Sequence, residues 1–205
     1  MHSVAFEHNQ ITYGSLFLLL MLYAFAPPAI SAQGASLQKT TRLVAETHAS
    51  TADELISTIN AYRVANGLPA IAPSRTLNLV AKLHVDDLQV NNPDKGICNM
   101  HSWSNAGDWS ACCYKDINPK TACMWNKPRE ISGSKYSANG YEVSAWLSEQ
   151  MNAESALALW KKSSGHHEVI MNRGSWSAVR WRAIGAAMSE NYAVVWFGTS
   201  RDAPR

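Results

Sequence analysis

The sequence predicts an α+β protein in which a small, mainly antiparallel central sheet lies between two layers of helices. Two observations support this class. Apolar residues recur at helical spacing in several segments ahead of two strand-like segments near the end of the chain. The last of these, Tyr192 to Gly198, is apolar on both of its faces, as in a strand that is covered on both sides. Helices before a two-faced sheet imply a three-layer α-β-α sandwich in a single domain.

The composition is that of an ordinary globular protein. The chain has 205 residues, 46% of them apolar, and a formal net charge of +2, so it is long enough for one well-covered core. Lysine and arginine are scattered and form no block of like charge, which argues against a nucleic-acid partner. Eight tryptophans are many for this length; they usually serve as large buried anchors, although tryptophans on loops can stack against sugars.

The N-terminus predicts a signal peptide over residues 1–32. The apolar run from Ser15 to Ala26 is shorter than the roughly 20 residues that a helix needs to cross a bilayer. Small residues before Gln33 offer a cleavage site. The segment before the apolar run lacks lysine and arginine, so an uncleaved membrane anchor is the alternative. We expect a secreted or periplasmic protein with no stable membrane insertion after the signal is removed.

Residues 33–50 are polar and without periodicity, which predicts a short flexible lead to the folded part. The first helix is expected to begin at Thr51, because Thr51 and Glu54 have the form of a capping box and apolar residues follow at helical spacing. Asn66-Gly67 is expected to close this helix.

A second helix is predicted from about Arg75 to Val90. Its apolar face includes His84, so we expect a core histidine whose ring is hydrogen-bonded. A further helix from Asn152 to Lys162 opens with a capping asparagine. Gly165 is expected to break this helix, which places His166 near the N-terminus of the next one, where backbone N–H groups favour a neutral imidazole.

Residues 98–127 form a loop-like segment, hereafter the insert. It holds all four cysteines (Cys98, Cys112, Cys113 and Cys123) and three tryptophans (Trp103, Trp109 and Trp125). An even cysteine count behind a signal peptide predicts disulfides. Adjacent cysteines do not readily pair with each other, so two connectivities remain: Cys98–Cys112 with Cys113–Cys123, or the exchanged pairing. A zinc site of four thiolates fits this spacing poorly.

Two strands are predicted at the end of the chain. Trp181 to Met188 and Tyr192 to Gly198 are separated by three residues of hairpin length. In the second strand Tyr192, Val194 and Trp196 point one way, and the residues between them point the other.

Taken in order, these segments resemble the CAP superfamily, which groups cysteine-rich secretory, antigen-five-type and plant pathogenesis-related proteins with many bacterial members. The motifs that carry the resemblance are Ile59-Asn60-Ala61-Tyr62-Arg63 with Gly67-Leu68-Pro69, Leu79 to Asp87, His101-Ser102, Gly140-Tyr141-Glu142-Val143, Trp160 with Ser163-Ser164-Gly165-His166, and Ala183-Ile184-Gly185. The resemblance covers a domain at 51–199, followed by a tail at 200–205, and its Ser-x-Gly-His segment is similar to the bacterial branch. The insert is not part of the common family pattern.

The resemblance implies the CAP (SCP) fold, with a central cleft that carries two histidines and one or two glutamates. By position these are His101, Glu142 and His166 in this chain, a suitable ligand set for Zn²⁺ or another divalent cation. The second family glutamate is replaced by Ser163. His167 and Glu168 are nearby substitutes.

Three functions are compatible with this pattern. The favoured one is a non-catalytic secreted binding protein with a cleft that can hold a metal ion. Its partner would be a cell-envelope glycan or a host protein. The first alternative is a hydrolase that uses a zinc-bound water, or His166 with Ser164 or Ser102 as nucleophile. No second glutamate and no His-Glu-x-x-His helix support it.

The second alternative is recognition of a glycan or cell-envelope polymer by the insert. Trp103, Trp109 and Trp125 would then serve as stacking surfaces. We favour the simpler interpretation that these tryptophans form a small local core under the disulfides, because large aromatic side chains are mostly at least partly buried.

Overall fold

The structure is a computed structural model that describes residues 32–115 and 121–203. Apart from Ala32, the predicted signal peptide lies outside the described residues. Within the described part of the chain, no helix combines the length and the apolar character needed to cross a bilayer.

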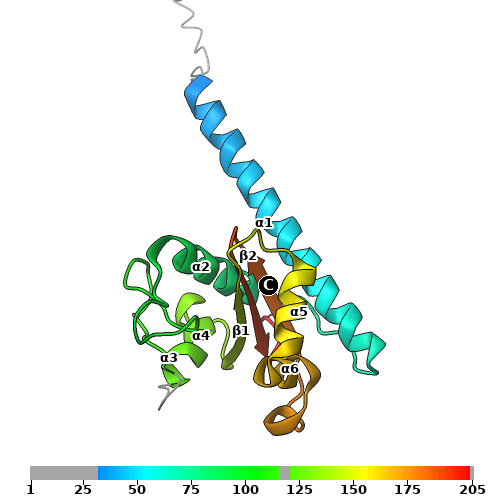
Figure 1. The fold of residues 1–205 in the computed structure, drawn as a ribbon. Coiled ribbons are helices and arrows are strands. Elements are labelled where there is room, and N and C mark those ends of the chain that lie inside the picture. Colours follow the sequence, from blue (N-terminus) through cyan, green and yellow to red (C-terminus); the bar gives the residue numbers. More distant parts are fainter. Residues whose placement is uncertain (1–31, 116–120, 204–205) are drawn as a thin grey trace, which may run out of the picture.

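A three-stranded antiparallel sheet forms the middle layer (Figure 1). Its strands are β1 (Gly140–Trp146), β2 (Ala183–Met188) and β3 (Tyr192–Gly198), in the spatial order β1-β3-β2. β3 is entirely buried, and its side chains alternate between two apolar clusters, one on each face of the sheet, as predicted. β1 is an edge strand that the sequence analysis did not assign; its pairing places Glu142 opposite Trp196.

Helices cover both faces of this sheet, so the predicted α+β sandwich is confirmed. On one face lie α1 (Ala32–Ala65), α5 (Ala153–Lys162) and α6 (Ser164–Met171), followed by the short η1 (Gly174–Trp176). On the other lie α2 (Arg75–Asn91) and the insert helices α3 (Thr121–Trp125) and α4 (Lys127–Ile131). Figure 1 shows the sheet between these two groups.

The first helix is longer than predicted. α1 begins at Ala32, so residues 33–50 are helical and the expectation of a flexible lead is wrong, as is the helix start at Thr51. Residues 37–42 are exposed, and Ala52 is the first buried residue among those of the helix whose burial is described. A helical segment that does not pack on the core needs no apolar stripe, and periodicity therefore does not reveal it. The predicted helix end is confirmed: α1 ends at Ala65, and Gly67, two residues later, adopts φ +80°.

α2 packs on β2 at very short range. Ser74 caps the helix, its hydroxyl accepting a hydrogen bond from the N–H of Leu77. A Cβ atom at Gly185 would lie 2.1 Å from the Leu77 backbone carbon, so only glycine allows this approach. This close approach holds α2, and therefore His84, against the sheet.

The break between α5 and α6 lies at Ser163 and not at Gly165. Asn152 caps α5 as predicted, and Ser163 is in an extended conformation (φ −95°, ψ 113°). Gly165 is already inside α6, with a negative φ and no atom within 4 Å of a Cβ placed there. The turn is therefore made by Ser163, and His166 is the third residue of α6.

The disulfides connect Cys98 to Cys113 and Cys112 to Cys123, the second of the two predicted connectivities. Trp103 and Cys112 pair through two backbone hydrogen bonds of 2.7 and 3.0 Å. The disulfides thus hold a narrow ribbon against α3, with Trp103 on its buried side.

Candidate functional site

Glu142, on edge strand β1, is the centre of the site. Its side chain is fully buried, and each of its carboxylate oxygens meets one histidine. Oε1 lies 2.7 Å from Nδ1 of His84, and Oε2 lies 3.3 Å from Nδ1 of His101. The first is a short, strong contact and the second a longer, weaker one.

His84, on α2, is a buried core histidine with both ring nitrogens engaged, as predicted. Its Nε2 lies 2.9 Å from the backbone oxygen of Ser102, which can only accept a hydrogen bond. Its Nδ1 faces the Glu142 carboxylate, another acceptor. Both ring nitrogens thus face acceptor oxygens, and the ring is held between the Glu142 carboxylate and the Ser102 backbone.

The ionised state of Glu142 follows from its neighbours. Burial acts to raise the pKa of the Glu142 carboxyl, but the charge of His84 and the hydrogen bonds from His101 and His84 outweigh burial and lower this pKa below its usual value. Glu142 therefore stays an anion between two imidazoles.

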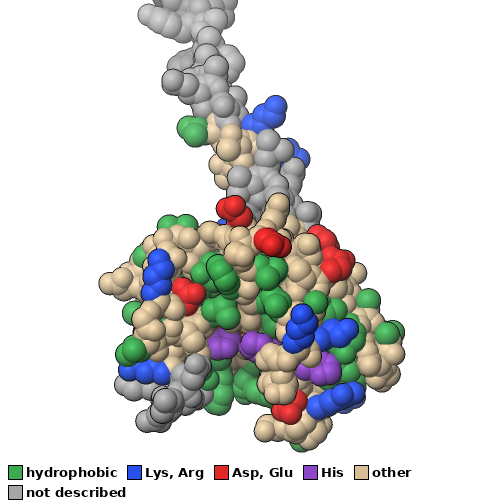
Figure 2. Space-filling view, viewed as in Figure 1, with side chains coloured by type: hydrophobic (Ala, Val, Ile, Leu, Met, Phe, Trp, Pro, Cys, Tyr) green, Lys and Arg blue, Asp and Glu red, His purple; other side chains and the backbone are tan. Residues whose placement is uncertain are grey.

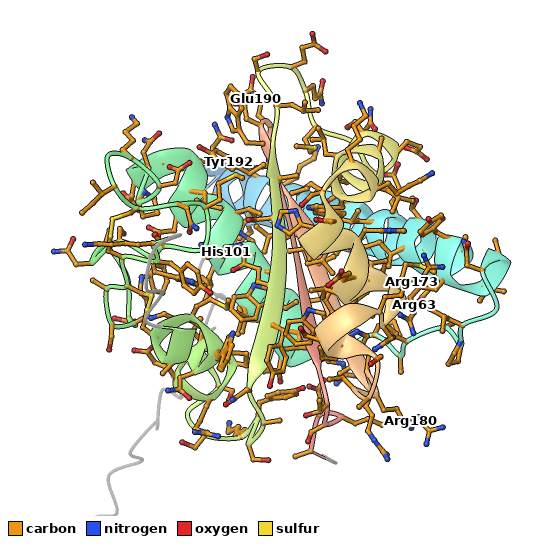
Figure 3. All side chains as sticks on the ribbon, turned by 60° about the horizontal axis from the view of Figure 1, so that its bottom comes forward. Arg63, His101, Arg173, Arg180, Glu190 and Tyr192 are labelled. Atoms are coloured by element: carbon orange, nitrogen blue, oxygen red, sulfur yellow. A yellow bond between two sulfur atoms is a disulfide. The ribbon has the colours of Figure 1, made fainter. Side chains whose placement is uncertain are left out.

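His101 and His166 come from opposite helical layers and meet at the β1 edge. Their ring centroids are 6.2 Å apart, with the planes at 72°. Figure 2 shows histidine side chains side by side near the centre of one face, and Figure 3 shows His101 beside the edge strand. The Nδ1 atom of His101 faces Glu142, so the carboxylate fixes the orientation of this ring.

His166 is a neutral base. Burial lowers the pKa of its imidazole to about 4, and the neighbouring His101 adds to this effect, while Glu142 opposes it. The expectation of a neutral His166 is thus supported, with burial as the main cause. A neutral imidazole has a lone pair for a proton or a metal ion.

The structure therefore places all three predicted residues at one site, with Glu142 contacting His101 and His101 neighbouring His166. Among the described residues, however, no group of three or more histidine, cysteine, aspartate or glutamate side chains has the disposition of a metal site. Both oxygens of Glu142 are already engaged by imidazoles.

Comparison with solved structures gives the fold. An extracellular SCP-domain protein from Bacillus anthracis superposes with a TM-score of 0.51 at 15% identity, covering 75% of this chain and 41% of that one. The chain has the SCP-domain fold. This confirms the fold that the resemblance implies; at this identity the likeness does not extend to activity.

Two further solved structures are similar to this chain, with lower TM-scores. A cysteine-rich secretory protein from Staphylococcus aureus has a TM-score of 0.48 at 11% identity, covering 76% of this chain and 40% of that one. An outer surface protein from Borrelia burgdorferi has a TM-score of 0.45 at 17% identity, covering 73% and 90%. The chain spans about two fifths of the length of the first two structures. No family model and no curated protein sequence matches it.

Neither candidate for a second carboxylate or imidazole belongs to the site of this SCP-fold domain. Nε2 of His167 lies 2.9 Å from the hydroxyl of Tyr62 on α1. The carboxylate of Glu168 lies against Gly174, where a Cβ atom would be 2.4 Å from it. Both side chains thus support packing around α6.

The serines named as nucleophiles are not paired with His166. Ser102 is fully buried, and its hydroxyl exchanges hydrogen bonds with the backbone of Tyr114. Ser164 is exposed at the start of α6 and makes no hydrogen bond to His166 in the described structure. In the described part of the chain, neither of these two serines is hydrogen-bonded to His166.

The tryptophans of the insert pack inward, so the local-core interpretation is confirmed. Trp103 is 2% exposed, and Trp109 packs edge-on against it with a centroid distance of 5.1 Å. The indole nitrogen of Trp109 donates to the backbone oxygen of Ser104. Trp125 is partly buried against Tyr141, 5.4 Å away.

The sequence analysis missed that His84 and Trp103 support the site. The two rings stack with centroids 4.2 Å apart and planes 8° apart. The spacing of α2 indicated that His84 is buried, but its partner lies 58 residues away on β1. A buried histidine needs an acceptor for each protonated nitrogen, and that requirement was the available signal.

Proposed function

We propose that this protein is a secreted member of the CAP superfamily whose His101 and His166 imidazoles bind a divalent transition-metal ion such as Zn²⁺, in a binding role without catalysis. The observation that carries the proposal is the meeting of these two rings at the β1 edge, with His101 backed by a buried carboxylate. Histidines that ligate zinc commonly hold a carboxylate on their other nitrogen, which orients the ring and raises its basicity.

The proposal assigns different roles to the three residues. His166 and His101 would be the ligands, since imidazole nitrogen is a preferred donor for zinc. Glu142 would act behind His101 and not on the metal, because both of its oxygens face imidazoles. With two protein ligands the remaining positions would be left to water or to a partner molecule, which suits a binding role.

Secretion is supported by the disulfides. Two bridges in the insert leave no free cysteine among the described residues. Such bridges persist in oxidising compartments and are rare in reducing ones. Together with the apolar segment before Ala32, this favours an extracellular or periplasmic location.

The test is calorimetric titration of the oxidised protein with Zn²⁺. We expect one-to-one binding that His166→Gln abolishes and that Glu142→Gln weakens about 10- to 100-fold, the usual effect of losing a supporting carboxylate. His167→Gln is the matched control, because His167 is the next residue on the same helix but contacts Tyr62.

Binding that persists in His166→Gln, or that is lost equally in His167→Gln, would contradict the assignment. Binding should also weaken at acidic pH, because the ligands must be unprotonated. Circular dichroism of each variant establishes that it is folded before its affinity is compared.

A further inference from the structure

A second site lies at the end of the molecule where the loop after α1 meets the segment before β2. It is a pocket of about 310 Å³, at the lower end of the size range of ligand sites. Its lining residues are Pro69, Ala70, Ala72, Arg180, Trp181, Arg182 and Arg201. Three of these seven are arginines, and no acidic residue lines the pocket.

The three arginines are not neutralised by the protein. All are exposed, and among the described residues no hydrogen bond or ion pair engages their guanidinium groups. The carboxylate next in sequence, Asp202, is occupied elsewhere: it accepts hydrogen bonds from the hydroxyl of Ser74 and the N–H of Arg75. Figure 3 shows the side chain of Arg180 projecting from the molecule.

The frame around these arginines is fixed. The buried Arg63 donates from Nε to the backbone oxygen of Pro69 and so holds the loop after α1. Trp181 is 6% exposed and donates from its indole nitrogen to the backbone oxygen of Val169. The backbone N–H of Arg182 donates to Gly198 at the end of β3. The wall of the pocket is therefore rigid and includes the indole of Trp181.

Guanidinium groups on a rigid frame have a definite chemical preference. Three like charges around one pocket repel one another, and an anion placed among them relieves this repulsion. The planar fork of arginine matches the oxygens of phosphate and sulfate with two parallel hydrogen bonds. Pro69, Ala70 and Ala72 add an apolar wall, which would contact a body attached to the anionic group.

We propose that Arg180, Arg182 and Arg201 form a binding site for a tetrahedral oxyanion, a phosphate or sulfate group, carried on a sugar-like body. The site is separate from the histidine pair and does not depend on the proposed metal. It would give the domain a charge-based contact with anionic glycans.

The experiment is titration calorimetry of the full-length oxidised protein with glucose 6-phosphate, inorganic phosphate, inorganic sulfate and glucose. We expect glucose 6-phosphate to bind more tightly than the inorganic ions, and glucose not to bind. Each change of Arg180, Arg182 or Arg201 to Gln should weaken binding about tenfold or more, since each removes charge-assisted hydrogen bonds. Added salt should weaken binding in parallel.

The controls are the single variants K95Q, K135Q and K162Q, each of which removes one positive charge, as each arginine variant does, from an exposed position outside the pocket. Loss of binding in these controls equal to that in the arginine variants would overturn the site, because net charge alone would then explain it. Failure of every anion to bind would overturn it as well. Equal affinity for inorganic phosphate and glucose 6-phosphate would overturn the proposal that the anionic group is carried on a sugar.

Discussion

The imidazole of His84 stacks on the indole of Trp103, with ring centroids 4.2 Å apart and planes inclined by only 8°. The ammonium group of Lys127, itself 1% exposed, lies 5.2 Å from the same indole. The indole of Trp103 thus contacts both an imidazole ring and a lysine cation, and the quadrupole of the indole attracts the cation. The insert therefore supports the site indirectly. Trp103 stacks on His84, His84 contacts Glu142, and Glu142 orients His101.

Replacing Trp103 should destabilise the domain strongly. Trp103→Ala removes a large buried side chain, and we expect the free energy of unfolding to fall by about 3–5 kcal/mol. Trp146→Ala is the control, because Trp146 is 50% exposed at the end of β1 and should cost under about 1 kcal/mol. Urea denaturation followed by circular dichroism measures both, and similar losses in the two variants would contradict the role of Trp103.

The His84–Glu142 pair should behave as a coupled unit. Glu142→Gln removes the carboxylate that contacts the fully buried His84 ring, and breaking such a buried pair costs about 3–5 kcal/mol. The double variant with His84→Gln removes both partners of this contact, so it should recover part of this loss. A double-mutant cycle of unfolding free energies tests the coupling, and strictly additive losses would show that the two side chains do not interact.

The free energy of unfolding should fall as the pH becomes acidic. The pKa of His166 is about 4 in the fold because of burial, against 6.5 for an ordinary histidine. The unfolded chain therefore takes up this proton first, and the free energy of unfolding falls as pH decreases from about 6.5 to about 4, by up to about 3 kcal/mol. The pKa of Glu142, lowered by His84 and His101 against burial, adds a further loss at lower pH.

His166→Gln should remove the part of this pH dependence between pH 6.5 and 4, and His167→Gln should retain it. Thermal unfolding measured across this range at constant ionic strength gives the comparison. An unchanged acid profile in His166→Gln would mean that another group causes the loss.

Two glycines should respond oppositely to alanine. At Gly185 a Cβ atom would lie 2.1 Å from the backbone of Leu77, so Gly185→Ala should push α2 off the sheet and cost about 3 kcal/mol. At Gly165, inside α6, the space is open and the backbone helical, so alanine should stabilise the domain by about 0.5 kcal/mol. Thermal denaturation measures the stability change in both variants. A loss of stability in Gly165→Ala would indicate that the conformational freedom of this glycine is needed.

Local patterns in the sequence predict most of the fold. The caps at Asn152 and the Asn66-Gly67 helix end, and the alternation along β3, depend on neighbouring residues and could be recognised directly. The strand β1 could not, because an edge strand that carries a buried glutamate does not show the apolar pattern of β3. The break at Ser163 was misplaced since glycine is the usual signal for a turn, and here a serine makes it.

The candidate site was predicted only in part, for a related reason. His101, Glu142 and His166 follow from the family resemblance, and the structure brings them together. The engagement of both Glu142 oxygens by imidazoles depends on contacts between α2, the insert and β1, which lie far apart in sequence. The disulfide pairing likewise depends on the approach of α3 to the ribbon, and the spacing of the cysteines allowed two solutions.

The continuous helix α1 has a geometric consequence for whatever precedes the domain. Residues 32–51 add about 30 Å of helix ahead of the buried Ala52, and Figure 1 shows the start of α1 projecting beyond the body of the protein. A helix transmits rotation as well as distance. Each residue inserted or removed in this stalk would turn the domain by about 100° relative to the preceding segment, so its length sets the direction in which the histidine pair faces.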